Sequence, residues 1–305
     1  MKNISIENLI FRTPLIVAGN NRKYIKKAFS CECDCIVLDL EDGVPFSCKE
    51  EARKIIRETL KNKRPGPKPV LVRVNSLETD LTEEDVNGIA CRELQGFVYP
   101  KTQTADEINR FAELLTRKEN ELDLPEGHFK IVSIIETPLA MLNLKEIAFS
   151  SPRLIALLLG AEDLLGDMQG HHGPLGRSLH MIRTSVLLAA RAASLIPIDT
   201  PYIHVKNKKG LKQFIEPARE LGYEGMLVIS PSQIPIVKEM YTPSQHEVRD
   251  ALEMEKIAAE ASESGKSVVL KDKLFVSAPT LKGAGNLLKR YRKIKYFEKE
   301  VNRER

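Results

Sequence analysis

The stretch Leu154–Asp167, LIALLLGAEDLLGD, decides the fold that the rest of the chain must fit. It begins with a run of Leu, Ile and Ala without alternation, which is typical of a strand covered on both faces, and such strands belong to parallel sheets. The run stops at Gly160 and is followed by two acids, Glu162 and Asp163. Because ligands bind at the carboxyl ends of parallel strands, we expect these acids to face whatever the sheet binds.

Seven further apolar runs bounded by turn signals lie on either side of this stretch, and amphipathic segments with a helical spacing of three to four residues separate most of them. Alternation of strand and helix predicts a parallel sheet. The number of units favours an α/β fold of the TIM (β/α)₈ barrel type over two doubly wound domains, which would require a linker. The expected strands are residues 14–19, 35–42, 69–75, 96–102, 130–137, 154–163, 198–205 and 225–229.

The pattern changes beyond residue 240. An amphipathic helix is expected at residues 246–263, a short strand pair within 267–276, and a basic helix from Lys282 onward. We therefore expect a barrel domain at residues 1–240 and a C-terminal helical appendage at 241–305, which would pack at a subunit interface.

The composition excludes several classes of protein. With 305 residues, 42% of them hydrophobic and 29% charged, the chain is typical of soluble globular proteins, and it has no apolar run long enough to span a membrane. The N-terminus lacks the features of a signal peptide, and five cysteines do not form a secreted disulfide framework, so we expect a cytoplasmic protein with reduced thiols. The net charge of +4 is spread along the chain, which suits a small anionic ligand and indicates neither nucleic acid nor membrane as a partner.

Acidic and basic side chains stand at the ends of the second to sixth expected strands. In a barrel, the carboxyl ends of all strands lie on one face, so residues far apart in sequence are brought together there. The residues concerned are Asp39, Glu41, Asp42, Arg73, Asn75, Lys101, Glu136, Glu162 and Asp163.

Three of these residues suit a particular chemistry. Glu136 and Asp163 can hold Mg²⁺, which takes one or two carboxylates and leaves its other positions to water and substrate oxygens. Arg73 offers a planar fork for a carboxylate or a carbonyl oxygen. Together they would bind a 2-oxo acid and stabilise an enolate.

A purely structural interpretation of the same residues is also open. Glu136 can cap a helix that starts at Pro138, and Arg73 can pair with Glu41 or Asp42 without touching a ligand. The spacing alone gives the functional and structural interpretations about equal weight, because strand ends of barrels are often catalytic but strand boundaries are hard to predict.

Two other groups of potential metal ligands are weaker candidates. Cys31, Cys33 and Cys35 alternate at the entry to a strand and lack a second pair of ligands, so we expect small buried side chains rather than a metal site. His171 and His172 follow a glycine turn, where a solvated loop is the better interpretation. Gly-rich phosphate-binding motifs are absent from the sequence.

Eight separate motifs resemble, in the same order, the signature segments of the citrate lyase β-subunit-like group of the HpcH/HpaI aldolase superfamily. Agreement of several motifs along most of the chain is far more specific than a single GAED would be. The motifs are RTPLIVAGN (12–20), DCIVLDLEDGVP (34–45), VRVN (72–75), YPKT (99–102), IIETP (134–138), LLLGAEDLLGD (157–167), IDTPY (198–202) and ISPSQI (229–234).

The resemblance implies a reaction as well as a fold. It implies a TIM barrel, usually a homotrimer or a multiple of one, that uses Mg²⁺ to cleave or form a carbon–carbon bond of a 3-hydroxyacyl thioester such as citryl-, malyl- or citramalyl-coenzyme A. The products would be an acyl thioester and a 2-oxo acid such as oxaloacetate, pyruvate or glyoxylate. An acyl carrier protein is an alternative to coenzyme A as the thioester partner.

The matched motifs also imply roles for individual residues. Glu136 and Asp163 become the metal ligands, and Arg73 becomes the catalytic, substrate-binding arginine. The supporting positions of the catalytic group are Glu41 and Asp42, and the contacts expected with an anionic substrate or coenzyme A phosphates are Arg12 and Lys101.

The sequence departs from the family pattern at the position of its general acid or base. Members with lyase or thioesterase activity often carry an Asp two residues before a Pro in the appendage, where the VSAP segment of this chain places Ser277. A serine hydroxyl cannot replace a carboxylate as a base at neutral pH without an activating partner. Met226 and Ser230 likewise stand where the family commonly has Lys and His. The alternative hypothesis is therefore a catalytically altered member that binds a 2-oxo acid or acyl thioester, as a metabolite-binding protein or a subunit of a complex.

Overall fold

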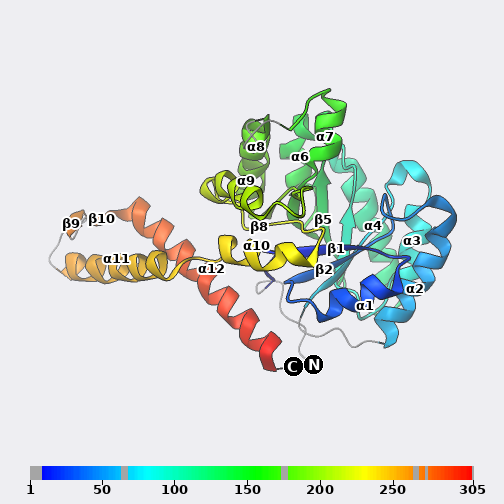
Figure 1. Ribbon diagram of the computed structural model, residues 1–305, viewed down its shortest axis with the longest axis horizontal. Helices are drawn as coiled ribbons and strands as arrows, with labels where there is room; N and C mark the ends of the chain where they lie inside the picture. The colour runs from blue at the N-terminus through cyan, green and yellow to red at the C-terminus, as the bar shows by residue number, and fades with distance from the viewer. Residues whose placement is uncertain (1–8, 63–67, 173–177, 264–267, 272–273, 304–305) are drawn as a thin grey trace. The chain divides into compact units, whose positions relative to one another are not determined.

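The computed structural model describes residues 9–62, 68–172, 178–263, 268–271 and 274–303. The chain forms two compact units (Figure 1). The larger unit is Phe11–Tyr241, and the smaller one combines Leu9 and Ile10 with the segment from Thr242 onward.

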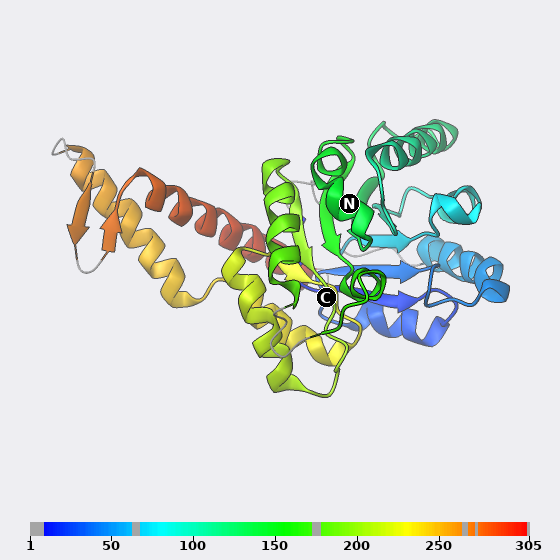
Figure 2. The same cartoon turned by 90° about the horizontal axis from the view of Figure 1, so that it is seen from above.

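The larger unit is a barrel of eight parallel strands that follow one another in sequence order, as predicted. Figure 2 shows strands of the sheet side by side with helices outside them. The eighth strand returns to the first, because the Val228 N–H donates to the Pro14 carbonyl at 2.8 Å and the Ile16 N–H donates to the Val228 carbonyl at 3.0 Å. The strands are β1 (Pro14–Ala18), β2 (Cys35–Asp39), β3 (Val70–Arg73), β4 (Gly96–Tyr99), β5 (Lys130–Ile135), β6 (Leu154–Leu159), β7 (Ile196–Asp199) and β8 (Gly225–Met226).

Helices connect successive strands and form the outer layer of the barrel. Local sequence explains several of their ends: Thr104 and Glu107 form a capping box before α4, and Gly222 ends α9 with a φ of +114°, which favours glycine. The connection between β5 and β6 consists of two short helices that meet at Asn143. The helices are α1 (Arg22–Ser30), α2 (Lys49–Asn62), α3 (Thr82–Ile89), α4 (Ala105–Glu121), α5 (Pro138–Leu142), α6 (Leu144–Ala148), α7 (Ala161–Asp167), α8 (His180–Ala192), α9 (Lys208–Leu221) and α10 (Ile234–Tyr241).

The strands are shorter at their carboxyl ends than the sequence predicted, most clearly in β7. The expected strand at residues 198–205 is wrong, since β7 begins at Ile196 and ends at Asp199. Pro201 has no N–H for a sheet ladder, and the Thr200 hydroxyl accepts a hydrogen bond from the Ala161 N–H at 3.1 Å instead. The polar residues assigned to strand ends therefore lie mainly in the loops that follow the strands.

The core has two layers, one inside the barrel and one between strands and helices. Side chains of a strand alternate between these layers, and the inner layer consists almost entirely of aliphatic residues. In the outer layer, the Phe97 ring packs edge-on against Phe111 and Phe129, with ring centroids 5.8 and 5.4 Å apart. The sheet is thus buried on both faces, as the unalternating apolar run of β6 indicated.

The smaller unit is a helical hairpin with two short strands at its turn. It consists of α11 (Gln245–Glu263), β9 (Val269–Lys271), the antiparallel β10 (Leu274–Val276) and α12 (Ala278–Arg303). The two helices pack through small and aliphatic side chains, namely Val248, Ala251, Ala284 and Leu288, and Ile10 packs on Ile294 and Phe297 of α12. The expected helices and strand pair are present, although residues 267, 272 and 273 of the expected pair lie outside the described residues. Among the described helices, none is long and apolar enough to cross a membrane.

A buried ion pair on the outer side of the barrel gives a prediction for stability. The Glu119 carboxylate accepts hydrogen bonds from Arg153 Nη1 and Nη2, both at 2.7 Å, and from the N–H groups of Gly127 and Phe129. Arg153→Met leaves this carboxylate buried without its cation, so we expect the free energy of unfolding to fall by about 3–5 kcal/mol. Urea unfolding followed by circular dichroism measures the change.

The matched control is Lys54→Met, which removes one end of an exposed ion pair with Glu50. Exposed pairs of this kind contribute little, so its unfolding midpoint should equal that of the unchanged protein. Equal midpoints for Arg153→Met and Lys54→Met would contradict the assigned importance of the buried pair.

Candidate active site

The loops after β2, β3, β4, β5 and β6 gather charged side chains at one edge of the barrel. All eight strands run in the same direction, so their carboxyl ends share that edge. The structure brings together there, through ion pairs, hydrogen bonds and mutual electrostatic effects, the residues Asp39, Glu41, Asp42, Arg73, Lys101, Glu136 and Asp163.

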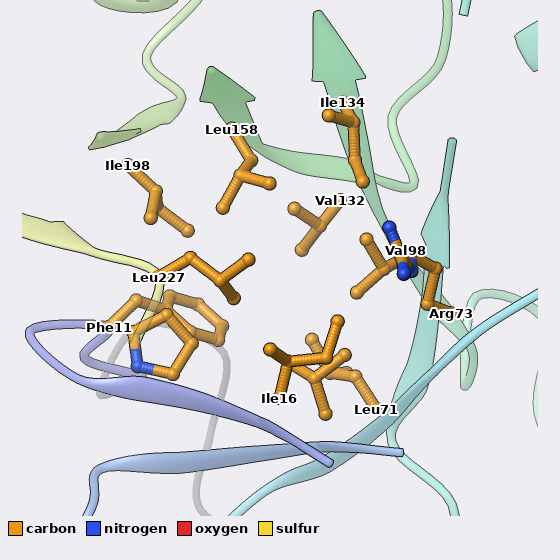
Figure 3. A pocket seen from close by; sticks show the side chains of 12 residues that line it. Phe11, Ile16, Leu71, Arg73, Val98, Val132, Ile134, Leu158, Ile198 and Leu227 are labelled. Carbon is orange, nitrogen blue, oxygen red and sulfur yellow. The ribbon is translucent and has the colours of Figure 1, made fainter. Parts of the chain in front are cut away.

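Arg73, the last residue of β3, is held on one side by the neighbouring strand. Its Nε and Nη2 donate to the two carboxylate oxygens of Asp39 at 2.6 and 2.8 Å, and its Nη1 lies 3.0 Å from Glu41 Oε2. Figure 3 shows that Arg73 shares a small pocket inside the barrel with apolar side chains, and it is the only charged residue lining that pocket. The structural interpretation named Glu41 correctly as a partner of Arg73 but missed the two-pronged contact with Asp39.

Glu41 connects Arg73 to Lys101. Its carboxylate is buried, and Lys101 Nζ lies 3.0 Å from Oε1 and 3.6 Å from Asp42 Oδ1. Burial raises the pKa of the Glu41 carboxyl, whereas the charge of Arg73 acts in the opposite direction. Asp42 is 57% exposed, so its carboxylate faces solvent at the rim.

Lys101 also holds Glu136 through its backbone. Its φ of +48° lies in the left-handed region, which is unusual for a residue with a side chain and indicates local strain. In this conformation the Lys101 N–H donates to Glu136 Oε1 at 2.6 Å, while the Lys101 ammonium reaches Glu41. One strained residue therefore fixes the spacing of two carboxylates.

Glu136 is a buried carboxyl with an unusual proton affinity. Burial raises its pKa to about 8, and the negative charges of Glu41 and Asp163 act in the same direction. Its Oε2 lies against Gly160, where a Cβ atom would come within 2.5 Å of it. The suggested role of Glu136 as a helix cap is wrong, because the side chain of Thr137 accepts the Ala140 N–H at the start of α5.

Asp163 lies in the first turn of α7 and is exposed. The start of this helix is fixed by the hydrogen bond from the Ala161 N–H to Thr200 at the end of β7. The neighbouring Glu162 forms a hydrogen bond with His172, with 2.7 Å between Glu162 Oε1 and His172 Nε2. Glu162 thus has its own partner, while the charge of Asp163 acts on Glu136.

The two carboxylates fit a magnesium ion better than a metal that needs many protein ligands. Within the described part of the chain, no three or more His, Cys, Asp or Glu side chains are grouped so that they could hold a metal ion by themselves. Mg²⁺ usually takes one or two carboxylates and keeps water and substrate oxygens. Burial raises the pKa of Glu136, and the negative charges of Glu41 and Asp163 add to that effect. A divalent cation would favour the ionised carboxylate, so Glu136 and Asp163 suit this ion.

Comparison with known proteins identifies the family of the chain. Residues 12–231 match the family described as HpcH/HpaI aldolase/citrate lyase. The chain belongs to this family. It is 31% identical to the citrate lyase subunit beta of Leuconostoc mesenteroides subsp. cremoris, over 91% of this chain and 92% of that protein. It is 30% identical to the mitochondrial citramalyl-CoA lyase of Homo sapiens, over 90% of this chain and 84% of that protein.

One solved structure is similar over nearly the whole chain. It is the CitE protein from Mycobacterium tuberculosis in complex with magnesium, acetoacetate and coenzyme A. The two chains are 26% identical with a TM-score of 0.73, and the match covers 93% of this chain and 99% of that one.

Arg12 does not lie with the other residues that the sequence predicted for the site. It precedes β1 and therefore lies at the amino end of the strands, away from the carboxyl-end loops. Its side chain is buried, and its Nε and Nη2 donate to the carboxylate of Asp34 at 2.7 and 2.9 Å. The structure thus contradicts the expected substrate contact, because an arginine buried at that end cannot reach a ligand at the opposite edge.

Three residues that support the site had no role assigned from the sequence. Asp39 accepts hydrogen bonds from Arg73, and Gly160 leaves space for the Glu136 side chain. Lys49 donates to the backbone of the loop that carries Glu41. One signal pointed to Lys49: a basic residue at the first position of a helix opposes the helix dipole, so its side chain needs another reason to be there.

Gly160 gives a prediction about the packing of the site. A Cβ atom at this position would lie 2.5 Å from both Cβ and Oε2 of Glu136, so Gly160→Ala must displace that side chain. We expect a loss of about 1–3 kcal/mol in the free energy of unfolding from this overpacking. Gly166→Ala is the control, since a Cβ there meets nothing within 4 Å and alanine is the better helix former. Urea unfolding should show opposite signs for the two variants, and equal signs would contradict the close packing of Glu136.

Proposed function

We propose that the protein is a Mg²⁺-dependent carbon–carbon lyase. It acts on a 3-hydroxyacyl thioester such as citryl-, malyl- or citramalyl-coenzyme A and yields an acyl thioester and a 2-oxo acid. The observation that carries the proposal is the buried Glu136 carboxyl, which has the carboxylate of Asp163 and the guanidinium of Arg73 near it at the carboxyl edge of the barrel. Membership of the family supports it, as do the similar mitochondrial citramalyl-CoA lyase and the CitE structure that contains magnesium, acetoacetate and coenzyme A.

Four residues of the candidate site have a defined part in this reaction. Glu136 and Asp163 would hold Mg²⁺, which when bound supplies a Lewis acid for the oxygens of the 2-oxo acid. Arg73, already oriented by Asp39, presents its remaining N–H groups to the oxygen that gains negative charge. Lys101 keeps Glu136 in place through its N–H, and its ammonium adds positive charge for an anionic substrate.

The reaction also requires two proton movements. The 3-hydroxyl proton leaves as the bond between C2 and C3 breaks, and the electron pair of that bond goes to the carbon next to the thioester, which then takes up a proton. Ser277, at the family's acid position, has its N–H bonded to Thr280 Oγ1 at 2.9 Å and its hydroxyl 3.3 Å from the same atom. Neither contact activates a serine, so the proton carrier is not assigned to it.

The contacts of Ser277 favour one alternative function. In it, the protein keeps the metal and 2-oxo acid site but serves as a metabolite-binding protein or a subunit of a complex. Calorimetry would then show binding of oxaloacetate in the presence of Mg²⁺, without turnover of any thioester. Turnover of a thioester rejects this alternative.

The assembly and setting of the protein are part of the same proposal. We infer a cytoplasmic homotrimer, or a multiple of one, in which residues 1–240 form the catalytic domain and the appendage packs at a subunit interface. An acyl carrier protein in place of coenzyme A remains an alternative partner. Light scattering after size-exclusion chromatography tests the trimer, and a monomeric mass would reject it.

Asp163→Asn tests the metal assignment directly. The amide has the shape of the carboxylate without its charge, so we expect kcat/KM for the best of the three thioesters to fall by about a hundredfold or more. The measurement is Mg²⁺-dependent release of coenzyme A or 2-oxo acid. Asp106→Asn, at an exposed position in the first turn of α4, is the matched control and should keep full activity. Equal turnover of the Asp163 variant and the unchanged protein would remove Asp163 from the metal site.

The raised pKa of Glu136 predicts how metal binding depends on pH. With a pKa of about 8, Glu136 is mainly protonated at pH 6–7, and Mg²⁺ must displace that proton. The affinity for Mg²⁺ should therefore rise about tenfold per pH unit from pH 6 toward 8 and level off above it. Calorimetric titration in two buffers of different ionisation enthalpy gives both the affinity and the proton released. An affinity that does not change between pH 6 and 8 would contradict Glu136 as a ligand.

A further inference from the structure

Lys49 is a buried lysine whose ammonium group is fully used inside the protein. Its Nζ donates to the Leu40 carbonyl at 2.7 Å, to the Glu41 carbonyl at 3.1 Å and to Asn75 Oδ1 at 2.7 Å. An ammonium has three N–H donors, so these contacts account for all of them. Lys49 therefore has no donor left for a substrate, and any effect on the reaction must pass through the groups that it holds.

Asn75, which accepts a hydrogen bond from Lys49, is itself held by other buried polar groups. Asn75 Nδ2 donates to Asp85 Oδ2 at 2.7 Å and to the Leu40 carbonyl at 3.1 Å. Asp85 is buried in α3 and accepts a hydrogen bond from Arg53 Nη1 at 2.9 Å. The lysine thus ties the loop after β2 to a satisfied polar network that includes α2 and α3.

Glu41 depends on its backbone for its position. Its carboxylate contacts Arg73 and Lys101 as ion pairs at 3.0 Å, but neither oxygen accepts a well-aligned hydrogen bond from the described residues. The backbone, in contrast, is held at both ends of the residue. Its N–H donates to Asp39 Oδ1 at 2.9 Å, and its carbonyl accepts from Lys49.

We propose that Lys49 is a positioning residue of the site, which clamps the Leu40–Glu41 backbone and thereby fixes the Glu41 carboxylate between Arg73 and Lys101. This inference rests on the proposed function, since it assigns the part that Lys49 plays in the same reaction. Burial lowers the pKa of Lys49, but the charges of Asp85 and Asp39 act against that effect, in keeping with an ammonium that serves as a donor.

The test is a double-mutant cycle in the full-length protein. Lys49→Met keeps the aliphatic stem and removes the ammonium, and the carbonyls of Leu40 and Glu41 retain the N–H groups of Asn75 and Val44 as donors, so the variant should fold. We expect kcat to fall by about tenfold to a hundredfold when the carboxylate of Glu41 is free to shift. In a Glu41→Gln background the same change should lower kcat by less than about twofold, because its target is already lost.

Lys68→Met is the matched control. Lys68 also donates to backbone carbonyls, those of Phe29 and Cys31, but it lies before β3 at the amino end of the barrel. Its loss should lower the unfolding midpoint as Lys49→Met does and leave kcat unchanged. If Lys49→Met lowers kcat equally in both backgrounds, or not at all, Lys49 has only a structural role and the inference is overturned.

A crystal structure of Lys49→Met separates this inference from the proposed function. If the unchanged protein cleaves none of the thioesters, the proposed function fails, but the position of Glu41 can still be read. A Glu41 carboxylate that has left Arg73 and Lys101 supports the positioning role. A carboxylate that has not moved overturns it, whatever the activity.

Discussion

The ion pair between Asp39 and Arg73 is the interaction on which the site depends. The two residues are direct partners in the ladder between β2 and β3, at the last position of both strands. Two parallel hydrogen bonds from one guanidinium to one carboxylate fix both distance and plane. The same carboxylate accepts the N–H groups of Glu41 and Gly43, so it also shapes the loop that follows β2. A buried pair therefore orients the Arg73 guanidinium and the loop after β2 at once.

The remaining charges around this pair do not balance. Among the described residues, Asp39 and Glu41 pair with Arg73 and Lys101, whereas Glu136 and Asp163 form no ion pair. The pKa of Glu136 is raised as a result, because burial and the nearby negative charges favour its protonated form. Such an arrangement is costly for folding and is typical of a site that is completed by a positive ligand. The electrostatics thus favour a cation-dependent reaction independently of any relative.

The sequence predicted the barrel and most of the residues that gather at its carboxyl edge, because both follow from patterns along the chain. Unalternating apolar runs identify buried strands, and polar residues after them lie at one edge in any parallel barrel. The same rule explains the failure at Arg12, which belongs to a strand motif but precedes its strand. Strand direction assigns such a residue to the opposite end of the barrel, so an arginine shared with a family motif is not by itself a ligand contact.

Other features of the site depend on contacts that no single stretch of sequence encodes. Nothing in YPKT indicates that Lys101 adopts a left-handed conformation, which costs on the order of 1 kcal/mol or more for a residue with a side chain. That cost is offset by the hydrogen bond of 2.6 Å from its N–H to Glu136 Oε1, which follows the next strand. The strain at Lys101 and the placement of Glu136 therefore exist only together, and both require the barrel to have formed first. A sequence pattern can name the residues of such a site, but only the assembled sheet defines how they hold one another.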